Sequence, residues 1–141
     1  FAAIPLLVSF IPMLMDTGGN CGSQSSTLII RGIALGEIQF SDLFRVMFKE
    51  FRVSLIVGVA LALANGIRIL IMYKNAGLAL VIGLSLVATI VISKLIGCVL
   101  PLIAKKLHMD PAIMASPLIT TLVDTCSILI YFNIATQVFQ L

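Results

Sequence analysis

The sequence predicts an all-α bundle of membrane-spanning helices. The chain has 141 residues, of which 60% are hydrophobic and only 11% are charged, whereas charged residues make up roughly 25% of ordinary soluble domains. Its mean hydropathy is +1.19. A small soluble fold faces water with most of its surface, and so few charges cannot cover that surface. The composition excludes a soluble enzyme, a nucleic-acid-binding module and a disordered regulator, and residues 1–141 are expected to form one transmembrane domain.

Four apolar segments are each long enough to cross a hydrocarbon core of about 30 Å. They cover residues 1–35, 53–73, 78–104 and 111–141. Backbone groups in lipid must form hydrogen bonds within their own segment, so each segment is predicted to be a helix.

The first segment, 1–35, is expected to be interrupted by the polar stretch 16–26. About 15 residues at 1.5 Å each precede Asp16, which would place this stretch deep in the membrane. Its glycines, Gly18 and Gly22, suit a close contact between helices, and its amide side chains suit a water-filled path. Both interpretations stay open. Asp16 is expected either to cap a helix that restarts there or to bind an ion at a pore mouth.

The connection after the first segment contains signals for a helix end and a helix start. Gly36 marks the end, and the pair Ser41–Asp42 marks a new N-cap. The stretch 42–52 alternates apolar and charged side chains at helical spacing, which predicts a separate amphipathic helix at the membrane interface. Further on, Asp110–Pro111 has Asp at the N-cap and Pro at the first helical position, and predicts the start of the last helix.

Basic residues near the ends of the apolar segments predict the orientation. Four of them cluster around the connection between the first two segments, and two follow the third segment. The positive-inside rule therefore places the loops 36–52 and 105–110 in the cytoplasm, with the ends Phe1 and Leu141 on the extracytoplasmic side.

Asp124 is the strongest candidate for a functional residue. It lies well inside the last apolar segment, near the bilayer midplane, where a carboxylate is costly and by default marks a functional site. Ser116, Thr120 and Asp124 recur at four-residue spacing and form one polar stripe on the helix. Alternatively, Asp124 is a packing residue paired with Lys94 or Arg68, two cations that are otherwise expected to interact with lipid headgroups.

The polar groups of the membrane segments are hard oxygen donors. The three isolated cysteines have no spacing typical of a zinc site or a disulfide framework. Mg²⁺ loses water reluctantly and is bound through one or two carboxylates plus retained waters. One carboxylate per chain is too little for a dehydrating cage, but two chains would bring two carboxylates to a shared axis. The residues favour a path for a hydrated divalent cation.

Two other functions remain open from the residues alone. One is a coupled secondary transporter of divalent metal ions with Asp124 as the carrier. The other is a membrane assembly subunit whose small residues only pack helices together. An enzyme is not expected, because the sequence offers no nucleophile paired with a base.

Two motifs resemble a known family. Residues 12–24, PMLMDTGGNCGSQ, followed by Ile30-Arg31-Gly32, resemble the second transmembrane helix of the MgtE magnesium channels. Residues 110–124, which begin with Asp-Pro and end with SPLITTLVD, are followed by Ile130-Tyr131-Phe132 and resemble that family's fifth helix. The two motifs come in the order that the family requires, and the resemblance covers essentially the whole chain.

The resemblance implies a homodimer in the lipid bilayer that mediates passive, Mg²⁺-selective uptake across the plasma membrane. Its pore would be lined by the first (1–35) and last (111–141) helices of both subunits. The transported Mg²⁺ would bind largely hydrated. The predicted metal-binding set consists of Asp124, Thr120, Asn20, Gly19, Gly18 and Ser116. Full-length relatives also have a cytosolic N domain, a pair of CBS domains and a first transmembrane helix, so the chain is expected to be a fragment.

Overall fold

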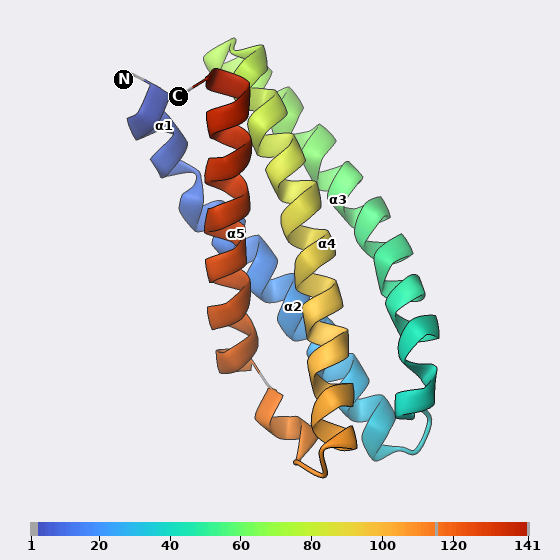
Figure 1. Cartoon of the computed structure of the whole chain (residues 1–141). Coiled ribbons are helices and arrows are strands. Elements are labelled where there is room, and N and C mark those ends of the chain that lie inside the picture. Colours follow the sequence, from blue (N-terminus) through green and yellow to red (C-terminus); the bar gives the residue numbers. More distant parts are fainter. Residues whose placement is uncertain (1–2, 115, 141) are drawn as a thin grey trace.

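The structure is a computed structural model that describes residues 3–114 and 116–140. Every regular element in these residues is a helix (Figure 1). The α-helices are α1 (Ala3–Ser9), α2 (Ile11–Ala34), α3 (Leu43–Tyr73), α4 (Ala76–Lys106) and α5 (Ser116–Phe139), and the short 3-10 helices are η1 (Phe40–Asp42) and η2 (Pro111–Met114). The predicted all-α membrane helix bundle is confirmed.

Three of the described helices, α3, α4 and α5, are long and apolar enough to cross a membrane. Helix α2 has 24 residues, about 36 Å at 1.5 Å per residue, so it has the necessary length. Its polar stretch 16–26 lowers its hydropathy, and it is therefore not among the three. The prediction of four apolar spans holds for three helices, and the fourth is a long polar helix packed against α4 and α5.

The first helical segment breaks at Phe10, which lies between α1 and α2. Pro12 has no N–H to donate to the carbonyl of Val8, and its ring would crowd that carbonyl, so one helix ends and another begins here. The predicted interruption at 16–26 is wrong, because α2 runs through that stretch without a break. Asp16 lies in the helix interior and does not cap a helix start.

Helix α2 ends at Ala34, and Gly36 follows directly after its C-cap, where the sequence predicts a helix end. Gly36 has a φ of +73°, a left-handed conformation that favours glycine. Its N–H donates to the carbonyl of Ile33 at 3.1 Å, and the N–H of Glu37 donates to the carbonyl of Gly32 at 2.9 Å. This pair of hydrogen bonds is the Schellman motif that commonly ends helices.

Helix α3 begins after Asp42, as predicted, but it includes the stretch expected to form a separate interfacial helix. It has 31 residues, about 46 Å, which exceeds the hydrocarbon core by roughly 16 Å. No glycine or proline lies between Leu43 and Gly58 to end the helix. The charged stretch is therefore the first part of one long helix, about ten residues beyond the apolar span.

The start of α5 also differs from the prediction. Asp110 accepts a hydrogen bond from the N–H of Ala112 through its Oδ1 at 3.0 Å, but this starts the short η2. The α-helix itself starts at Ser116. Pro117 thus lies in the first helical turn, where N–H groups have no partner within the helix. Its missing N–H therefore leaves no carbonyl inside the helix without a hydrogen bond.

Helix α4 lies between α3 and α5, and α2 crosses behind it (Figure 1). The start of α1 and the end of α5 lie at the same end of the bundle as the turn between α3 and α4. A large apolar cluster is formed there by Leu7, Phe10, Leu14, Ile69, Leu78, Val81, Ile82, Leu86, Tyr131 and Ala135. A smaller cluster of Ile29, Cys98 and Leu102 lies near η1. Between the two, glycines of α2 and α4 bring the backbones close together.

Candidate functional site

Helices α2 and α5 line an open hollow of about 310 Å³. Its walls are Met15, Asp16, Gly19 and Asn20 from α2 together with Thr120 and Asp124 from α5. Most of the predicted metal-binding set is therefore brought together at one place. Asp16, whose role the sequence left open, joins it.

The positions of these side chains follow from helical spacing. Asp16, Gly19 and Asn20 lie three and four residues apart on α2, and Thr120 and Asp124 lie four apart on α5, so each set shares one face of its helix. Gly19 allows the two faces to approach. A Cβ added at Gly19 would lie 3.3 Å from Cγ2 of Thr120, tighter than an ordinary contact.

The two carboxylates of the hollow have no cation beside them. In the described part of the chain, neither Asp16 nor Asp124 forms an ion pair, and no hydrogen bond involves the side chain of either aspartate or of Asn20. Asp16 and Asn20 are exposed, and Asp124 is half-buried. The Thr120 hydroxyl donates to the carbonyl of Pro117 at 3.1 Å. The unpaired groups give the hollow a net negative charge and free oxygen ligands.

The chemistry of the hollow suits a hydrated cation. Carboxylate and amide oxygens are hard ligands, which Mg²⁺ and Ca²⁺ prefer. The volume greatly exceeds the share of about 30 Å³ that one water occupies in the liquid. Over the described ranges, no three His, Cys, Asp or Glu side chains lie close enough to hold a metal ion together. A single chain can therefore attract an ion and contact its water shell, but it offers no dehydrating cage.

Two members of the predicted set lie elsewhere or cannot be assigned. Gly18 is buried in the contact between helices, where an added Cβ would lie 2.7 Å from Cγ2 of Thr89 and 2.9 Å from Cγ1 of Val123. It packs against α4 and α5 and does not line the hollow. Ser116 is the first residue of α5, but its side chain is outside the described residues.

A buried charge cluster among α2, α3 and α4 was missed by sequence reasoning. Oε2 of Glu50 accepts a hydrogen bond from Oγ of Ser25 at 2.7 Å and lies 3.6 Å from Nζ of Lys94. Nζ of Lys94 also donates to Oγ of Ser25 at 3.4 Å. All three side chains are buried, and they join α2, α3 and α4. The expectation that Lys94 interacts with lipid headgroups is wrong, because a carboxylate inside the bundle pairs with it.

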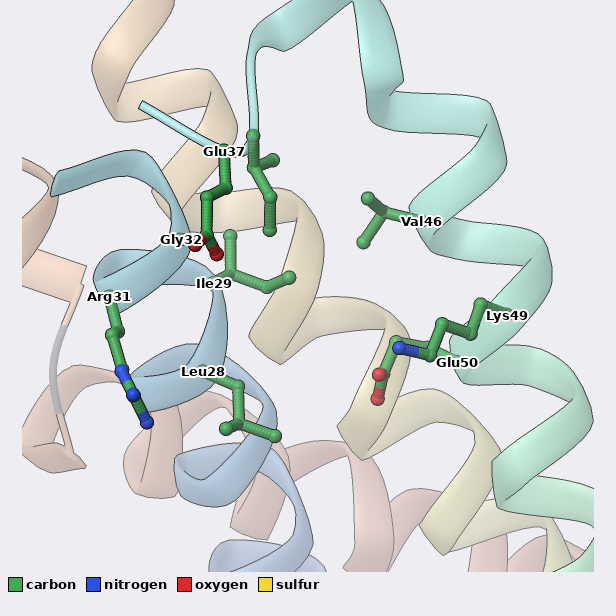
Figure 2. A pocket seen from close by; sticks show the side chains of 9 residues that line it. Leu28, Ile29, Arg31, Gly32, Glu37, Val46, Lys49 and Glu50 are labelled. Carbon is green, nitrogen blue, oxygen red and sulfur yellow. The ribbon is translucent and has the colours of Figure 1, made fainter. Parts of the chain in front are cut away.

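A signal for this cluster was present in the sequence. Glu50 is the lone acidic residue between Leu43 and Tyr73, and Lys94 is the lone charge between Leu78 and Ala104. A charge inside a membrane bundle normally pairs with another. Figure 2 shows Glu50 next to Lys49 on α3. Both residues line a second hollow, of about 260 Å³, together with residues of α2.

The neighbouring serine connects α2 to the segment that leads into α5. The hydroxyl of Ser26 donates to the carbonyl of Met114 in η2. Ser25 and Ser26 thus fix the end of α2 that follows Asn20 to both sides of the bundle. Arg68 lies with Nη2 3.7 Å from Sδ of Met13, so in the described residues it does not pair with Asp124.

The comparison with known proteins identifies the family. The sequence model of the MgtE family, described as a divalent cation transporter, matches residues 11–134. The chain belongs to the MgtE family. The matched residues include both walls of the hollow and the buried charge cluster, so these features lie within the region that matches the family.

Three curated relatives are each named Magnesium transporter MgtE. The protein from Bacillus subtilis is 42% identical over 92% of the chain. The proteins from Thermus thermophilus and Enterococcus faecalis are 37% and 35% identical, each over 94% of the chain. The chain spans about 29% of the length of each of these MgtE proteins.

Proposed function

We propose that this chain forms a Mg²⁺-selective channel that mediates passive magnesium uptake across the plasma membrane. Its pore is lined by α2 and α5 of two subunits. The observation that carries the proposal is the hollow in which Asp16, Asn20 and Asp124 converge without ion-pair or hydrogen-bond partners in the described residues. The names of the relatives supply the identity of the ion.

A dimer turns the open hollow into a closed path. Each subunit contributes two carboxylates, so a shared axis between two hollows is surrounded by Asp16 and Asp124 from both chains. Like charges that face each other in a narrow path repel strongly because little water screens them. A divalent cation relieves that repulsion. Mg²⁺ keeps its waters and contacts the carboxylates through them.

The proposed channel is a multi-pass membrane protein with the η1 and η2 end of the bundle in the cytoplasm. Support comes from the basic residues at this end, which include Arg45, Lys49, Arg52, Lys105 and Lys106. The start of α1 and the end of α5 then lie on the extracytoplasmic side. The cytosolic N and CBS domains implied by the resemblance belong to the same proposal, because the relatives are longer than the region they share with this chain.

The substitution Asp124→Asn tests the proposal in liposomes that report Mg²⁺ influx. The change keeps the shape and removes one charge. In poorly screened surroundings, the attraction between a carboxylate and a cation exceeds about 1.4 kcal/mol, the free energy that corresponds to a tenfold change. We therefore expect influx to fall by about tenfold or more. Glu37→Gln is the matched control, since Glu37 is exposed and lies outside the hollow. Influx and selectivity equal to those of the parent protein in Asp124→Asn would refute the proposal.

A second measurement separates the channel from the coupled secondary transporter. Reversal potentials are recorded under opposed gradients of Mg²⁺ and protons. A passive channel reverses at the Mg²⁺ equilibrium potential at every proton gradient. A reversal potential that shifts with the proton gradient would instead assign Asp124 the role of a carrier.

A further inference from the structure

We propose that the outer face of α3 binds an anionic phospholipid of the membrane, with its phosphate held by Arg45, Lys49 and Arg52. These three cations and the apolar side chains that follow them on the same face are called here the α3 lipid face. The proposal is independent of conduction, because the α3 lipid face and the hollow between α2 and α5 share no residue.

Helical spacing places the three cations together. Arg45, Lys49 and Arg52 are four and three residues apart and lie on one face of α3. Glu50 and Ser54 are buried on the opposite face, which packs toward α4. The first part of α3 therefore has its acid inside the bundle and its bases outside.

The three cations of the α3 lipid face line a groove in the protein surface. A groove of about 320 Å³ is lined by Ile38, Arg45, Val46, Phe48, Lys49 and Arg52. The guanidinium of Arg52 lies 4.9 Å above the ring of Phe48. Arg45 forms an exposed ion pair with Asp42 at 3.0 Å. Among the described residues, Lys49 and Arg52 have no carboxylate within ion-pair distance, so the groove keeps a net positive charge beside an apolar floor.

The same face continues as an apolar track into the membrane-spanning part of α3. The exposed side chains Ile56, Val59, Leu63, Ile67 and Leu70 follow Arg52 at steps of three or four residues. From Ile56 to Leu70 the track is about 21 Å long, more than half of a hydrocarbon core of about 30 Å. An acyl chain can therefore lie on the track while its headgroup stays at the cations.

Charge and position favour a lipid over other occupants. Basic pockets at the cytoplasmic ends of transmembrane helices bind anionic lipid headgroups, and exposed Phe44 and Phe48 beside basic residues are typical of a helix face that lies at the membrane interface. A free phosphate ion would use the cations but would leave the apolar track without a role. An acidic protein segment would likewise have no use for a track that lies within the membrane.

Native mass spectrometry of the purified, delipidated protein in neutral detergent tests the proposal. The protein is titrated with phosphatidylglycerol or phosphatidylcholine of the same acyl chains. We expect phosphatidylglycerol to bind about tenfold more tightly or better, since each basic residue near the surface attracts anionic lipid. Phosphatidylglycerol with eight-carbon chains should bind more weakly, and soluble glycerophosphate should not compete at the same concentration.

The variant Arg45→Gln/Lys49→Gln/Arg52→Gln should lose this preference, and its two lipids should bind within about twofold of each other. The control Lys74→Gln/Lys105→Gln/Lys106→Gln removes the same charge from other exposed positions and should keep it. The comparison of the two lipids uses the parent protein alone, so it remains informative even if a variant fails to fold. Equal binding of both lipids by the parent, equal losses in both variants, or effective competition by glycerophosphate would each overturn the proposal. Retained preference in the first variant would also overturn it and would leave the groove to another occupant, such as an acidic protein segment.

Discussion

Gly18 and Gly19 are neighbours in the sequence but lie in different surroundings. Gly18 faces the side chains of Thr89 and Val123 in the contact between helices, and Gly19 faces Thr120 across the hollow. A helix turns by about 100° from one residue to the next, so adjacent positions point to different neighbours. Gly18 therefore belongs to the packing between helices, and Gly19 lines the hollow.

Alanine substitutions at these two glycines should differ in their effects: one should lower stability, and the other should lower Mg²⁺ influx. Gly18→Ala puts a methyl group 2.7 Å from Thr89, and such overpacking typically costs about 1–3 kcal/mol of unfolding free energy. Gly19→Ala meets only Thr120 at 3.3 Å and gains helix propensity. We expect it to preserve stability while it narrows the hollow and reduces Mg²⁺ influx.

Thermal unfolding in detergent and influx into liposomes measure the two effects side by side. The assignment fails if Gly19→Ala conducts like the parent protein, or if Gly18→Ala is as stable as the parent protein.

Residue spacing predicted the polar stripe of α5, and the family resemblance supplied the residues of α2 that face it; neither predicted the buried charges. Thr120 and Asp124 share a face of α5 by local spacing, and Gly19 and Asn20 lie three and four residues from Asp16 on α2. Such spacing does not reveal which helices become neighbours. The pairing of Glu50 with Lys94 joins residues from different helices, and only the assembled bundle brings them within 3.6 Å.

At the scale of elements, proline and glycine interrupt a helix at some positions but not at others, depending on the packing around them. Pro12 ends α1 as its missing N–H requires. The glycine-rich stretch 16–26 predicts an interruption of the first segment, but α2 is continuous there. Each glycine costs a helix about 1 kcal/mol relative to alanine, and the close contacts of Gly18 and Gly22 with α4 and α5 compensate that cost. Those contacts depend on tertiary packing, which the sequence pattern does not reveal.

The cluster of Ser25, Glu50 and Lys94 should stabilise the contact among α2, α3 and α4. Removing one member of a buried ion pair leaves an uncompensated charge and typically costs about 3–5 kcal/mol. We expect Glu50→Gln and Lys94→Met each to lower the unfolding free energy by about this amount. The double variant should lose less than the sum of the two, by about 1 kcal/mol or more.

Unfolding by a denaturing detergent, followed by circular dichroism, measures these losses. Arg45→Gln serves as the control, because it breaks an exposed ion pair that should be worth less than about 1 kcal/mol. Additive losses in the double variant would show that Glu50 and Lys94 do not interact in the folded protein.

At the scale of the whole molecule, the hollow is open on one side, and the proposed dimer closes it. Asn20 lies at the exposed edge of the hollow, so two copies should approach each other across the axis. In a background with Cys21, Cys98 and Cys126 replaced by alanine, Asn20→Cys should form a disulfide-linked dimer under mild oxidation. Leu63→Cys, on the outer face of α3, should stay monomeric on a non-reducing gel. Equal cross-linking at both positions would argue against an axis between the hollows.

The ion pair between α3 and α4 also affects how the chain enters the bilayer during synthesis. Only Lys74 and Asn75 separate the two helices, so they form a helical hairpin that the insertion machinery can take up as one unit. Lys94 is the lone charge between Leu78 and Ala104, and an unpaired charge in a transmembrane helix disfavours insertion of that helix by itself. Glu50 is synthesised before Lys94 and lies beside it in the hairpin, so the two charges can cancel as they leave water. We expect α4 to insert less efficiently alone than behind α3, and Glu50→Gln to remove that advantage in a glycosylation-based insertion assay.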